Sequence, residues 1–241
     1  MRYGIFSDVH GNMEALEAVL KAYKDESIDR FICLGDIVGY GAEPSMCVSE
    51  IQRLNAVIIA GNHDWGAAGT FGLENFSVYA KEAILWTREK LSIKDKRFLE
   101  HLPLRYIDEN IVCVHGALRD PETFPYLHTI EHAREDFNIL KRSFAFIGHT
   151  HIPQVFTFAA GKAQALSRQR IRLSPGKLCI CNVGSVGQPR DGIPLASYCI
   201  FDTKKKLVEI KRIKYNISQT QSKIKDAFLP EFLAARLSQG R

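Results

Sequence analysis

The chain has 241 residues, of which 46% are apolar and 24% are charged, and its formal net charge is +5. These values are typical of a globular protein with one sizeable core. The basic residues are too dispersed to indicate a nucleic-acid-binding protein, although such a partner is left as an open alternative. No apolar run has the length of a transmembrane helix, and the first residues lack the pattern of a secretory signal. We therefore expect a single cytoplasmic domain over residues 1–241 that does not enter a membrane.

The six cysteines show no C-x-x-C spacing. Five of them lie in apolar, strand-like runs, where a thiol commonly serves as a small buried side chain; these are Cys33, Cys113, Cys179, Cys181 and Cys199. We expect reduced core cysteines, as in cytosolic proteins.

The first part of the chain alternates strand and helix patterns. Strands are expected at 3–6, 30–34 and 56–60, and helices at 12–24 and 44–54. In the first helix, Leu16, Val19 and Tyr23 recur at helical spacing, and Asn12 is its expected N-cap. Strands alternating with helices predict a parallel sheet with right-handed crossovers and both faces buried.

The rest of the chain becomes richer in strands. Two helices at 75–90 and 93–101 precede a hairpin at 104–108 and 111–114, a loop at 119–128, a helix at 130–140 and a strand at 144–147. Further strands are expected at 154–158, 169–173, 177–182, 196–202 and 207–212, with Lys204, Lys205 and Lys206 in a polar turn. A helical segment at about 216–238, broken near Pro230, should pack on the body through Ile224, Phe228, Phe232, Leu233 and Leu237.

Aspartate, asparagine and histidine residues follow five of the expected strands. Open α/β sheets bind ligands at the carboxyl ends of their strands. Asp8 and His10 point the same way from the end of an extended segment, because they are two residues apart. Oxygen and imidazole ligands together suit a divalent transition metal. One isolated histidine is more often a capping or core residue, but five of the eight histidines in this chain occur at the ends of expected strands. The group consists of Asp8, His10, Asp36, Asn62, His63, Asp64, His115, His149 and His151.

Glycines flank these candidates. Glycine permits a positive φ and a close approach of backbone, both of which a sharp turn requires when it directs a side chain inward. We expect this role for Gly11, Gly35, Gly61, Gly116 and Gly148.

At these residues the chain resembles the calcineurin-like metallophosphoesterases. The five blocks of that family correspond to Asp8-x-His10, Gly35-Asp36-x-x-Gly39, Gly61-Asn62-His63-Asp64, Val114-His115-Gly116 and Gly148-His149-x-His151. They occur in the order of the family. The stretches 182–190 and 229–233 further resemble the small prokaryotic phosphodiesterase branch.

The resemblance implies an α/β fold of four layers, an α/β/β/α sandwich in which helices flank two mixed sheets. The strand-rich second half fits this arrangement better than one doubly wound sheet.

The resemblance also implies two transition-metal ions, with Mn, Fe or Zn as the expected identities. Asp36 and a hydroxide would bridge them, and the hydroxide would be the nucleophile. By position, one ion would take Asp8, His10, Asp36 and His151, and the other would take Asp36, Asn62, His115 and His149. Such a centre keeps a net positive charge and should attract an anionic phosphate ester.

Further roles follow from the same resemblance. His63 is the expected general acid, with Asp64 orienting it, and its alternative role is to support Asn62. Asn62, His63 and Arg190 are expected to contact the substrate, although a single loop arginine is as often a surface residue. The loops 65–75 and 119–128 carry Trp65, Phe124 and Tyr126, which we expect to pack the loops rather than to stack on a substrate base.

Two departures from the sequence pattern of the family narrow the expected class of substrate. Protein phosphatases and diadenosine tetraphosphatases carry Gly-Asp-x-x-Asp-Arg-Gly, whereas residues 35–41 read Gly-Asp-Ile-Val-Gly-Tyr-Gly, and the third block ends in Asp64 instead of Glu. The expected function is therefore hydrolysis of a small phosphodiester. The alternatives are a phosphomonoesterase or protein phosphatase and, in another class, a non-catalytic interaction scaffold. The sequence indicates no oligomeric state.

Overall fold

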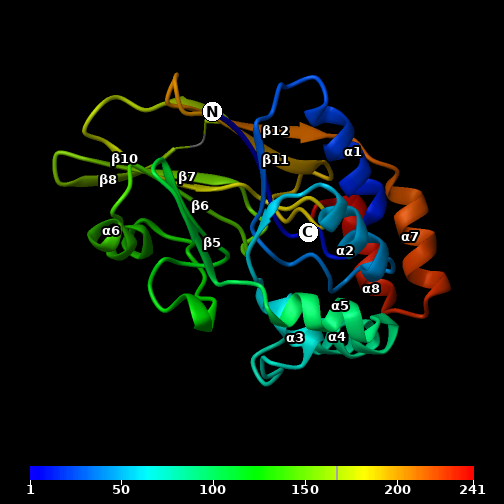
Figure 1. Cartoon of the computed structure of the whole chain (residues 1–241). Helices are drawn as coiled ribbons and strands as arrows, with labels where there is room; N and C mark the ends of the chain where they lie inside the picture. Colours follow the sequence, from blue (N-terminus) through cyan, green and yellow to red (C-terminus); the bar gives the residue numbers. More distant parts are fainter. Residues whose placement is uncertain (167) are drawn as a thin grey trace.

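The computed structural model describes residues 1–166 and 168–241 and has two six-stranded sheets of mixed direction (Figure 1). The first sheet has the order β3 (Val57–Ile58), β2 (Arg30–Cys33), β1 (Arg2–Phe6), β11 (Ala196–Asp202), β12 (Leu207–Ile213) and β9 (Arg170–Arg172). The second has the order β4 (Arg105–Ile107), β5 (Ile111–Val114), β6 (Phe144–Ile147), β10 (Leu178–Asn182), β7 (Gln154–Ala159) and β8 (Lys162–Leu166).

Parallel pairing places several strand ends at one edge. As the alternation of strands and helices predicts, β1 is parallel to β2 and β2 to β3. In the second sheet β5 is parallel to β6 and β6 to β10. The central strand β1 is also antiparallel to β11, which comes from the last quarter of the sequence.

Alternating side chains fill both faces of each sheet. In β1, Tyr3 and Ile5 lie in the cluster between the sheets, whereas Phe6 lies in the cluster beneath the helices. In β6, Phe144 and Phe146 face the first sheet. This period of two with both faces buried is expected of strands that lie between other layers.

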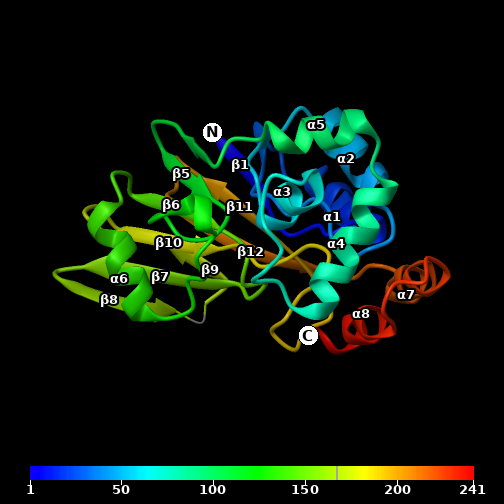
Figure 2. The same cartoon turned by 90° about the horizontal axis from the view of Figure 1, so that it is seen from below.

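Helices cover the outer faces. In the structure α1 (Met13–Tyr23) and α2 (Pro44–Arg53) pack on the first sheet, and α6 (Ile130–Ile139) packs on the second. Figures 1 and 2 show α6 on one side and α1 and α2 on the other, with the strands between them. The predicted four-layer α/β/β/α sandwich of mixed sheets is thus confirmed.

Helix caps account for several boundaries. The Asn12 side chain accepts a hydrogen bond from the Ala15 N–H at 3.1 Å, which confirms it as the N-cap of α1. Before α5 (Ile93–Glu100), Ser92 and Asp95 form a reciprocal capping box. Ser77 caps α4 (Val78–Lys90), so this helix starts three residues later than the predicted residue 75.

Two elements differ from the sequence prediction. The short helix α3 (Asn62–Ala68) occupies part of the predicted loop 65–75, so Trp65 is helical. Strand β8 was not predicted, because its residues are half-buried or exposed at the edge of the sheet and carry a weak apolar pattern. The loop 119–128 contains only a short 3-10 turn at Pro121–Thr123.

The segment 216–238 folds as α7 (Ile217–Asp226), α8 (Glu231–Ala235) and a 3-10 turn at Arg236–Gln239, with the interruption at Pro230. Ile224, Leu233 and Leu237 are buried as predicted. The prediction for Phe228 is wrong: its side chain is 92% exposed, because the residue has φ +55° in the turn after α7 and points outward. Phe232 is half-exposed and stacks on Tyr79.

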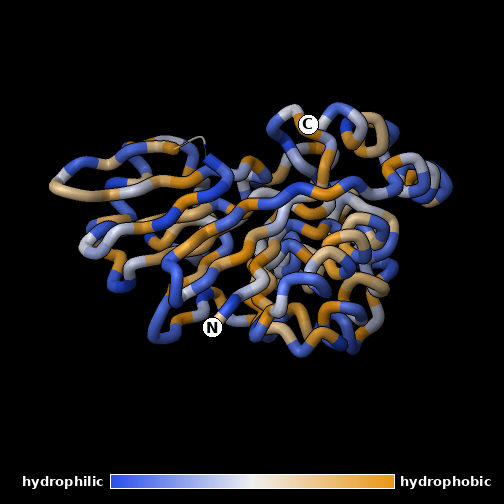
Figure 3. Tube along the Cα trace, turned by 90° about the horizontal axis from the view of Figure 1, so that it is seen from above, coloured by the Kyte–Doolittle hydropathy of each residue, from blue (hydrophilic) through white to orange (hydrophobic). Residues whose placement is uncertain are grey.

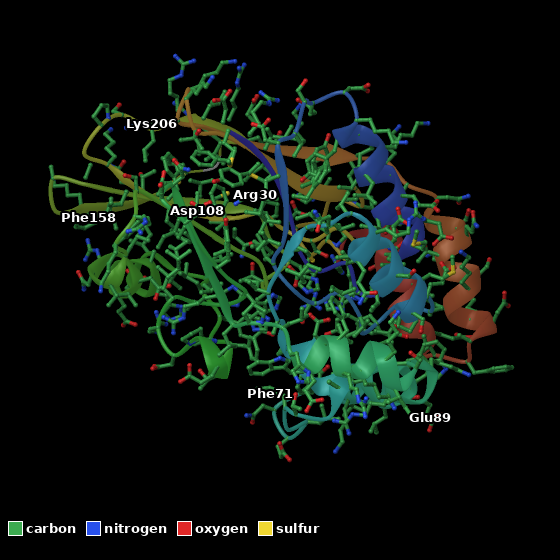
Figure 4. All side chains as sticks on the ribbon, in the orientation of Figure 1. Arg30, Phe71, Glu89, Asp108, Phe158 and Lys206 are labelled. Carbon is green, nitrogen blue, oxygen red and sulfur yellow. The ribbon has the colours of Figure 1, made fainter. Side chains whose placement is uncertain are left out.

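The surface and the interior separate as the hydropathy pattern predicts. Figure 3 shows hydrophobic segments in the central strands and mainly hydrophilic residues in the outer turns. Lys206 lies in the turn between β11 and β12, at the upper edge in Figure 4. All six cysteines are buried and free. None of the described helices has the length and apolar character needed to cross a membrane.

Candidate metal centre and substrate pocket

Two groups of side chains meet where the parallel strands of the two sheets end. One group has ligand atoms within 4.8 Å of one another and comprises Asp8, His10, Asp36 and His151. The second is defined in the same way and comprises Asp36, His115 and His149. All of these residues are buried, and Asp36 belongs to both groups. The structure therefore brings together the carboxylates and histidines that the sequence assigns to two ions.

The backbone at these residues is strained. Asp8, His10, Asp36, His149 and His151 have φ values between 51° and 68°, in the left-handed region. For a residue with a Cβ this conformation costs about 1–2 kcal/mol, and such outliers concentrate at functional sites. The left-handed turns thus lie at the ligands themselves as well as at flanking glycines such as Gly11 and Gly35.

Two other flanking glycines allow close approach instead. A Cβ on Gly61 would meet the Asp36 carboxylate and backbone, and a Cβ on Gly148 would meet Ser7 and Asp8. Both glycines have φ outside the positive range. The expected need for glycine is confirmed here through packing distance.

Backbone carbonyls orient three of the histidines. Nδ1 of His10 lies 3.1 Å from the Val38 carbonyl oxygen, Nδ1 of His115 lies 2.7 Å from that of Leu34, and Nδ1 of His151 lies 2.6 Å from that of Gln188. An Nδ1–H that donates to a carbonyl leaves the Nε2 lone pair free as a metal ligand. Nε2 of His151 lies 3.2 Å from Asp8 Oδ1, and Nε2 of His115 lies 3.2 Å from Asp36 Oδ2.

Buried polar atoms without partners show that this set fits metal ions. In the part of the chain that the structure describes, Asp8 Oδ1, Asp36 Oδ2, Asn62 Oδ1 and His115 Nε2 are buried and accept or donate no hydrogen bond. A buried polar atom left without a partner costs about 1–3 kcal/mol. Carboxylate, amide and imidazole donors of this kind suit Mn, Fe, Zn and related transition metals.

The two oxygens of Asp36 have different partners. Oδ1 accepts a hydrogen bond from the His63 backbone N–H at 2.9 Å. Oδ2 faces both groups, at 3.6 Å from His10 Nε2 and 3.2 Å from His115 Nε2. This geometry fits a carboxylate oxygen shared by two ions.

Neighbouring charges and burial have opposite effects on the pKa values of the two carboxylates, Asp8 and Asp36. Burial raises the pKa of Asp8, but the neighbouring His151 and His115 outweigh it and hold the pKa well below its usual range. For Asp36, His115 and His63 likewise outweigh burial and lower the pKa strongly. Both residues are therefore carboxylates at neutral pH, as metal ligands must be.

The histidines divide into two kinds. Burial lowers the pKa of His10 and His149 well below the usual value, and it also lowers that of His151, so these rings are neutral. For His115, burial is outweighed by the adjacent negative charges of Asp36 and Asp8, which raise its pKa to about 9. A cation bound beside Asp36 would displace that proton.

The expectation that Asp64 orients His63 is wrong. The Asp64 carboxylate accepts hydrogen bonds from the backbone N–H groups of Asp36 at 2.8 Å, Ile37 at 2.8 Å, Gly61 at 3.1 Å and Val38 at 3.3 Å. Burial and the adjacent Asp36 charge raise its pKa to about 7. Asp64 therefore fixes the turn that carries Asp36, because an acidic residue in the first turn of α3 reaches back to these donors.

His63 stands at the entrance to the centre. Its ring packs against those of His10, Tyr40 and Phe76, with centroids 4.7, 4.6 and 5.1 Å away. Its Nδ1 is buried and has no hydrogen-bond partner among the described residues. Burial lowers its pKa to about 4, and the nearby positive charge of Arg190 contributes.

A cavity of about 610 Å³ opens directly from Asn62, His63 and His149. The aromatic side chains Phe71, Phe76, Phe124 and Tyr126 form much of its wall. Phe71 lies in the loop that follows α3, at the lower edge of Figure 4.

The predicted aromatics take different places around this cavity. Tyr126 stacks on the His149 ring at 3.9 Å, so this predicted loop residue packs on a candidate ligand. Phe124 is buried and packs against Trp65, as predicted for these side chains.

Arg190 also lines the cavity. Its Nη2 donates to Gln188 Oε1 at 2.7 Å, and its guanidinium lies 5.5 Å from the Tyr40 ring centroid. Sequence reasoning did not identify Tyr40 or Arg236, which line the cavity as well. Tyr40 follows the Asp36 block, but Arg236 carries no sequence signal because it lies in an ordinary amphipathic segment.

Comparisons with known proteins agree with the site. A family model described as the calcineurin-like phosphoesterase superfamily domain matches residues 1–206. The uncharacterized protein MJ0912 of Methanocaldococcus jannaschii is 43% identical over an alignment of 242 positions that covers 98% of this chain and 97% of that protein.

Solved structures are similar along the whole chain. The crystal structure of a metallophosphoesterase from Sphaerobacter thermophilus has a TM-score of 0.88 and 38% identity, with 100% of this chain and 99% of that chain covered. The hypothetical protein PH1004 from Pyrococcus horikoshii OT3 has a TM-score of 0.81 at 20% identity, with 100% and 98% covered, and so shares the fold. By the family match over residues 1–206 and the identity to these relatives, the chain belongs to the calcineurin-like phosphoesterase superfamily and is a hydrolase of phosphoester bonds.

Proposed function

We propose that the protein is a metal-dependent phosphodiesterase that acts on a small phosphodiester. The observation that supports this most is the cavity of about 610 Å³ beside the two groups of candidate metal ligands described above, which we call the metal groups. Its volume lies within the usual range of small-molecule sites. Its aromatic walls offer space and contact for an ester arm in addition to the scissile phosphate.

The turn after Asp36 supports the same choice. A Cβ on Gly39 would lie 2.6 Å from His63 Nδ1 and 2.8 Å from His10 Nδ1. The aspartate that phosphatases of the family carry at this position therefore does not fit this backbone. Tyr40 takes the place of their arginine and packs on the two histidine rings.

When bound, two transition-metal ions supply Lewis acidity and a water of lowered pKa. In the proposal Asp8, His10, Asp36 and His151 hold one ion, and Asp36, Asn62, His115 and His149 hold the other. The chain contributes two carboxylates against two cations, so the site retains positive charge. Such a site stabilises the negative charge that develops on a phosphate during hydrolysis.

His63 is proposed as the proton donor to the leaving oxygen. It lies in the cavity wall, next to Asn62. Although the ring is neutral in the free protein, an anionic substrate beside it favours its protonated form. Arg190, which also lines the cavity, is proposed to contact a phosphate oxygen.

Two chromogenic esters test the reaction class. Metal-loaded protein should hydrolyse bis-p-nitrophenyl phosphate with a higher kcat/KM than p-nitrophenyl phosphate. A preference for the monoester would replace the diesterase by a phosphomonoesterase. No turnover of either ester, with two ions bound, would favour a scaffold.

A change of leaving group tests His63. A general acid matters more for a poor leaving group, because the departing oxygen then needs a proton in the transition state. His63→Ala should slow hydrolysis of diphenyl phosphate about 100-fold or more, and that of bis-p-nitrophenyl phosphate clearly less. Equal slowing of both esters would assign His63 to support of Asn62 instead.

A further inference from the structure

Two arginines from distant parts of the sequence share one cavity. Arg190 is the last residue of the stretch 182–190, and Arg236 begins the 3-10 turn near the end of the chain. Both line the cavity that also contains Asn62, His63 and His149. The family match ends at residue 206, so it provides no information about Arg236.

The two segments that carry these arginines are held in contact by a hydrogen bond and by buried side chains. The Gly192 N–H donates to the Gly240 carbonyl at 2.9 Å. Leu233 and Leu237 pack in one buried cluster with Tyr40, the residue beneath the Arg190 guanidinium. In Figure 2 the C-terminus lies beside the gold loop that precedes β11. Arg236 is thus held on the cavity wall by buried contacts.

Among the described residues, no side-chain carboxylate in the cavity lining balances the positive charge of the two arginines. Among the described residues, the cavity lining contains no aspartate or glutamate, and neither guanidinium forms a salt bridge with a side-chain carboxylate. Arg190 bonds to the neutral Gln188 side chain. Arg236 uses Nε to donate to the Arg241 main-chain oxygen and lies 5.0 Å from the Phe232 ring centroid. These contacts leave its two terminal amino groups available.

Arg190 is close enough for its charge to act on the histidines of the site and on Arg236. The charge of Arg190 contributes to the lowered pKa of His10, His63 and His151. Burial lowers the pKa of Arg236 to about 10, and the positive charge of Arg190 adds to the decrease. Arg236 still carries its proton at neutral pH, close to a second cation.

From this arrangement we propose that Arg236, with Arg190, forms a second anion subsite, and that the natural substrate is a phosphodiester with a terminal phosphate on one arm. The proposal rests on the phosphodiesterase activity proposed above. The metal groups and Arg190 attract the scissile phosphate. Arg236 then meets a further anionic group, and a terminal phosphate has a charge of about −1.5 to −2 near pH 7. Guanidinium groups bind phosphate through paired hydrogen bonds.

Two matched compounds test this subsite. Thymidine 5′-(p-nitrophenyl phosphate) and its 3′-phosphate differ only in the terminal phosphate. Metal-loaded wild-type protein should favour the 3′-phosphate about tenfold or more in kcat/KM and in the dissociation constant from calorimetry, as expected for one charge-assisted contact. Calorimetry measures the preference even if neither compound is hydrolysed.

Variants connect the preference to Arg236. Arg236→Gln should bring the ratio between the two compounds close to one, whatever it does to the affinity for each. Arg236→Lys should retain part of the ratio, since it keeps the charge but loses the planar fork. The matched control is Arg53→Gln on α2, where the arginine side chain is 77% exposed and pairs with Glu50; it should keep the wild-type ratio.

Two results would overturn the subsite. One is a wild-type ratio near one, and the other is an unchanged ratio in Arg236→Gln with only a lower Tm, which would make Arg236 a structural residue. Absence of hydrolysis with a retained calorimetric preference would instead reject the phosphodiesterase and keep the subsite.

Discussion

The bridging position of Asp36 is the residue-scale feature with the clearest consequence. Its Oδ2 faces both metal groups, whereas Asp8 belongs to one of them. Asp8 also has a second task, since its Oδ2 accepts a hydrogen bond from the His149 backbone N–H at 3.1 Å. The two carboxylates should therefore differ in how many ions depend on them.

We predict that Asp36→Asn loses metal from both groups and that hydrolysis falls at least about 100-fold, with the fold retained. In Asp8→Ala one ion should be lost and the other largely kept, with some weakening through His149. Elemental analysis of metal per protein, with circular dichroism as the check on folding, measures both. Unchanged turnover in Asp36→Asn, or equal loss of both ions in Asp8→Ala, would contradict the division.

Asp64 provides a second prediction at this scale. Its carboxylate accepts four backbone N–H bonds around the turn of Asp36 and does not touch the cavity. Asp64→Asn turns one acceptor oxygen into a donor that opposes these N–H groups. Metal affinity should fall about 10–100-fold, as for other residues that position ligands. Competition with a chelator measures it, and Glu43→Gln at the cap position before α2 serves as an acid-to-amide control. Wild-type affinity in Asp64→Asn would show that these backbone bonds are not needed to position Asp36.

At the scale of elements, the β4–β5 hairpin depends on one turn carboxylate. Asp108 Oδ1 accepts from the N–H groups of Asn110 and Ile111, and its Oδ2 accepts from the hydroxyls of Tyr3 and Tyr106. Burial raises the pKa of Asp108, but these four bonds outweigh it and lower the pKa below the usual value.

Asp108→Asn should lower the free energy of unfolding by about 1–2 kcal/mol at pH 7, because the amide opposes the two hydroxyl donors. The pKa of Asp108 is lower in the folded protein than in the unfolded chain, so its stabilisation is present above the unfolded pKa. It disappears as the pH falls through the folded pKa. The difference between wild type and variant, from urea titrations, should therefore shrink below about pH 4. A difference that stays constant from pH 7 to pH 3 would contradict this.

Strong local patterns explain which elements the sequence predicts. The helices capped by Asn12 and Ser92 and the buried strands match prediction within about two residues, because capping and alternation are local properties. Strand β8 has little apolar pattern, and α3 starts at a metal-site residue that the sequence presents as a strand end. The predicted burial of Phe228 is wrong for a different reason. Its helical spacing fits a core position, but the turn at φ +55° directs its side chain outward.

The candidate site follows the same rule. The histidines and carboxylates stand at recognisable strand ends, so the sequence identifies them. The hydrogen bonds of Asp64 and the position of Arg236 depend on how distant segments meet, and no local pattern encodes that.

At the scale of the whole molecule, each metal group joins the two sheets. Asp8, His10 and Asp36 follow strands of the first sheet, whereas His115, His149 and His151 follow strands of the second. A bound ion therefore connects both halves of the sandwich. Ligands that bind only the folded state increase its stability.

Removal of metal should lower the Tm by about 5–10 °C for each ion held at a hundred times its dissociation constant. Differential scanning calorimetry before and after chelation measures the shift, and amide exchange should rise at the ends of β1 and β6. Asp36→Asn is the control, because chelation should hardly change its Tm. An equal Tm for the metal-loaded and stripped wild-type protein would show that the ions do not connect the sheets.

The loop of Asp8 also has a consequence for synthesis on the ribosome. The Asp8 carbonyl accepts hydrogen bonds from the Gly187 N–H at 2.9 Å and from Ser185 Oγ at 2.8 Å, and β1 pairs with β11. At about 5–20 residues per second, roughly 10–40 s separate translation of Asp8 from that of Gly187. Until then the nascent chain has none of the donors that bind the Asp8 carbonyl in the folded protein. The first candidate ligand to be made therefore lacks these bonds until most of the chain has been translated, and we expect metal loading to follow that point.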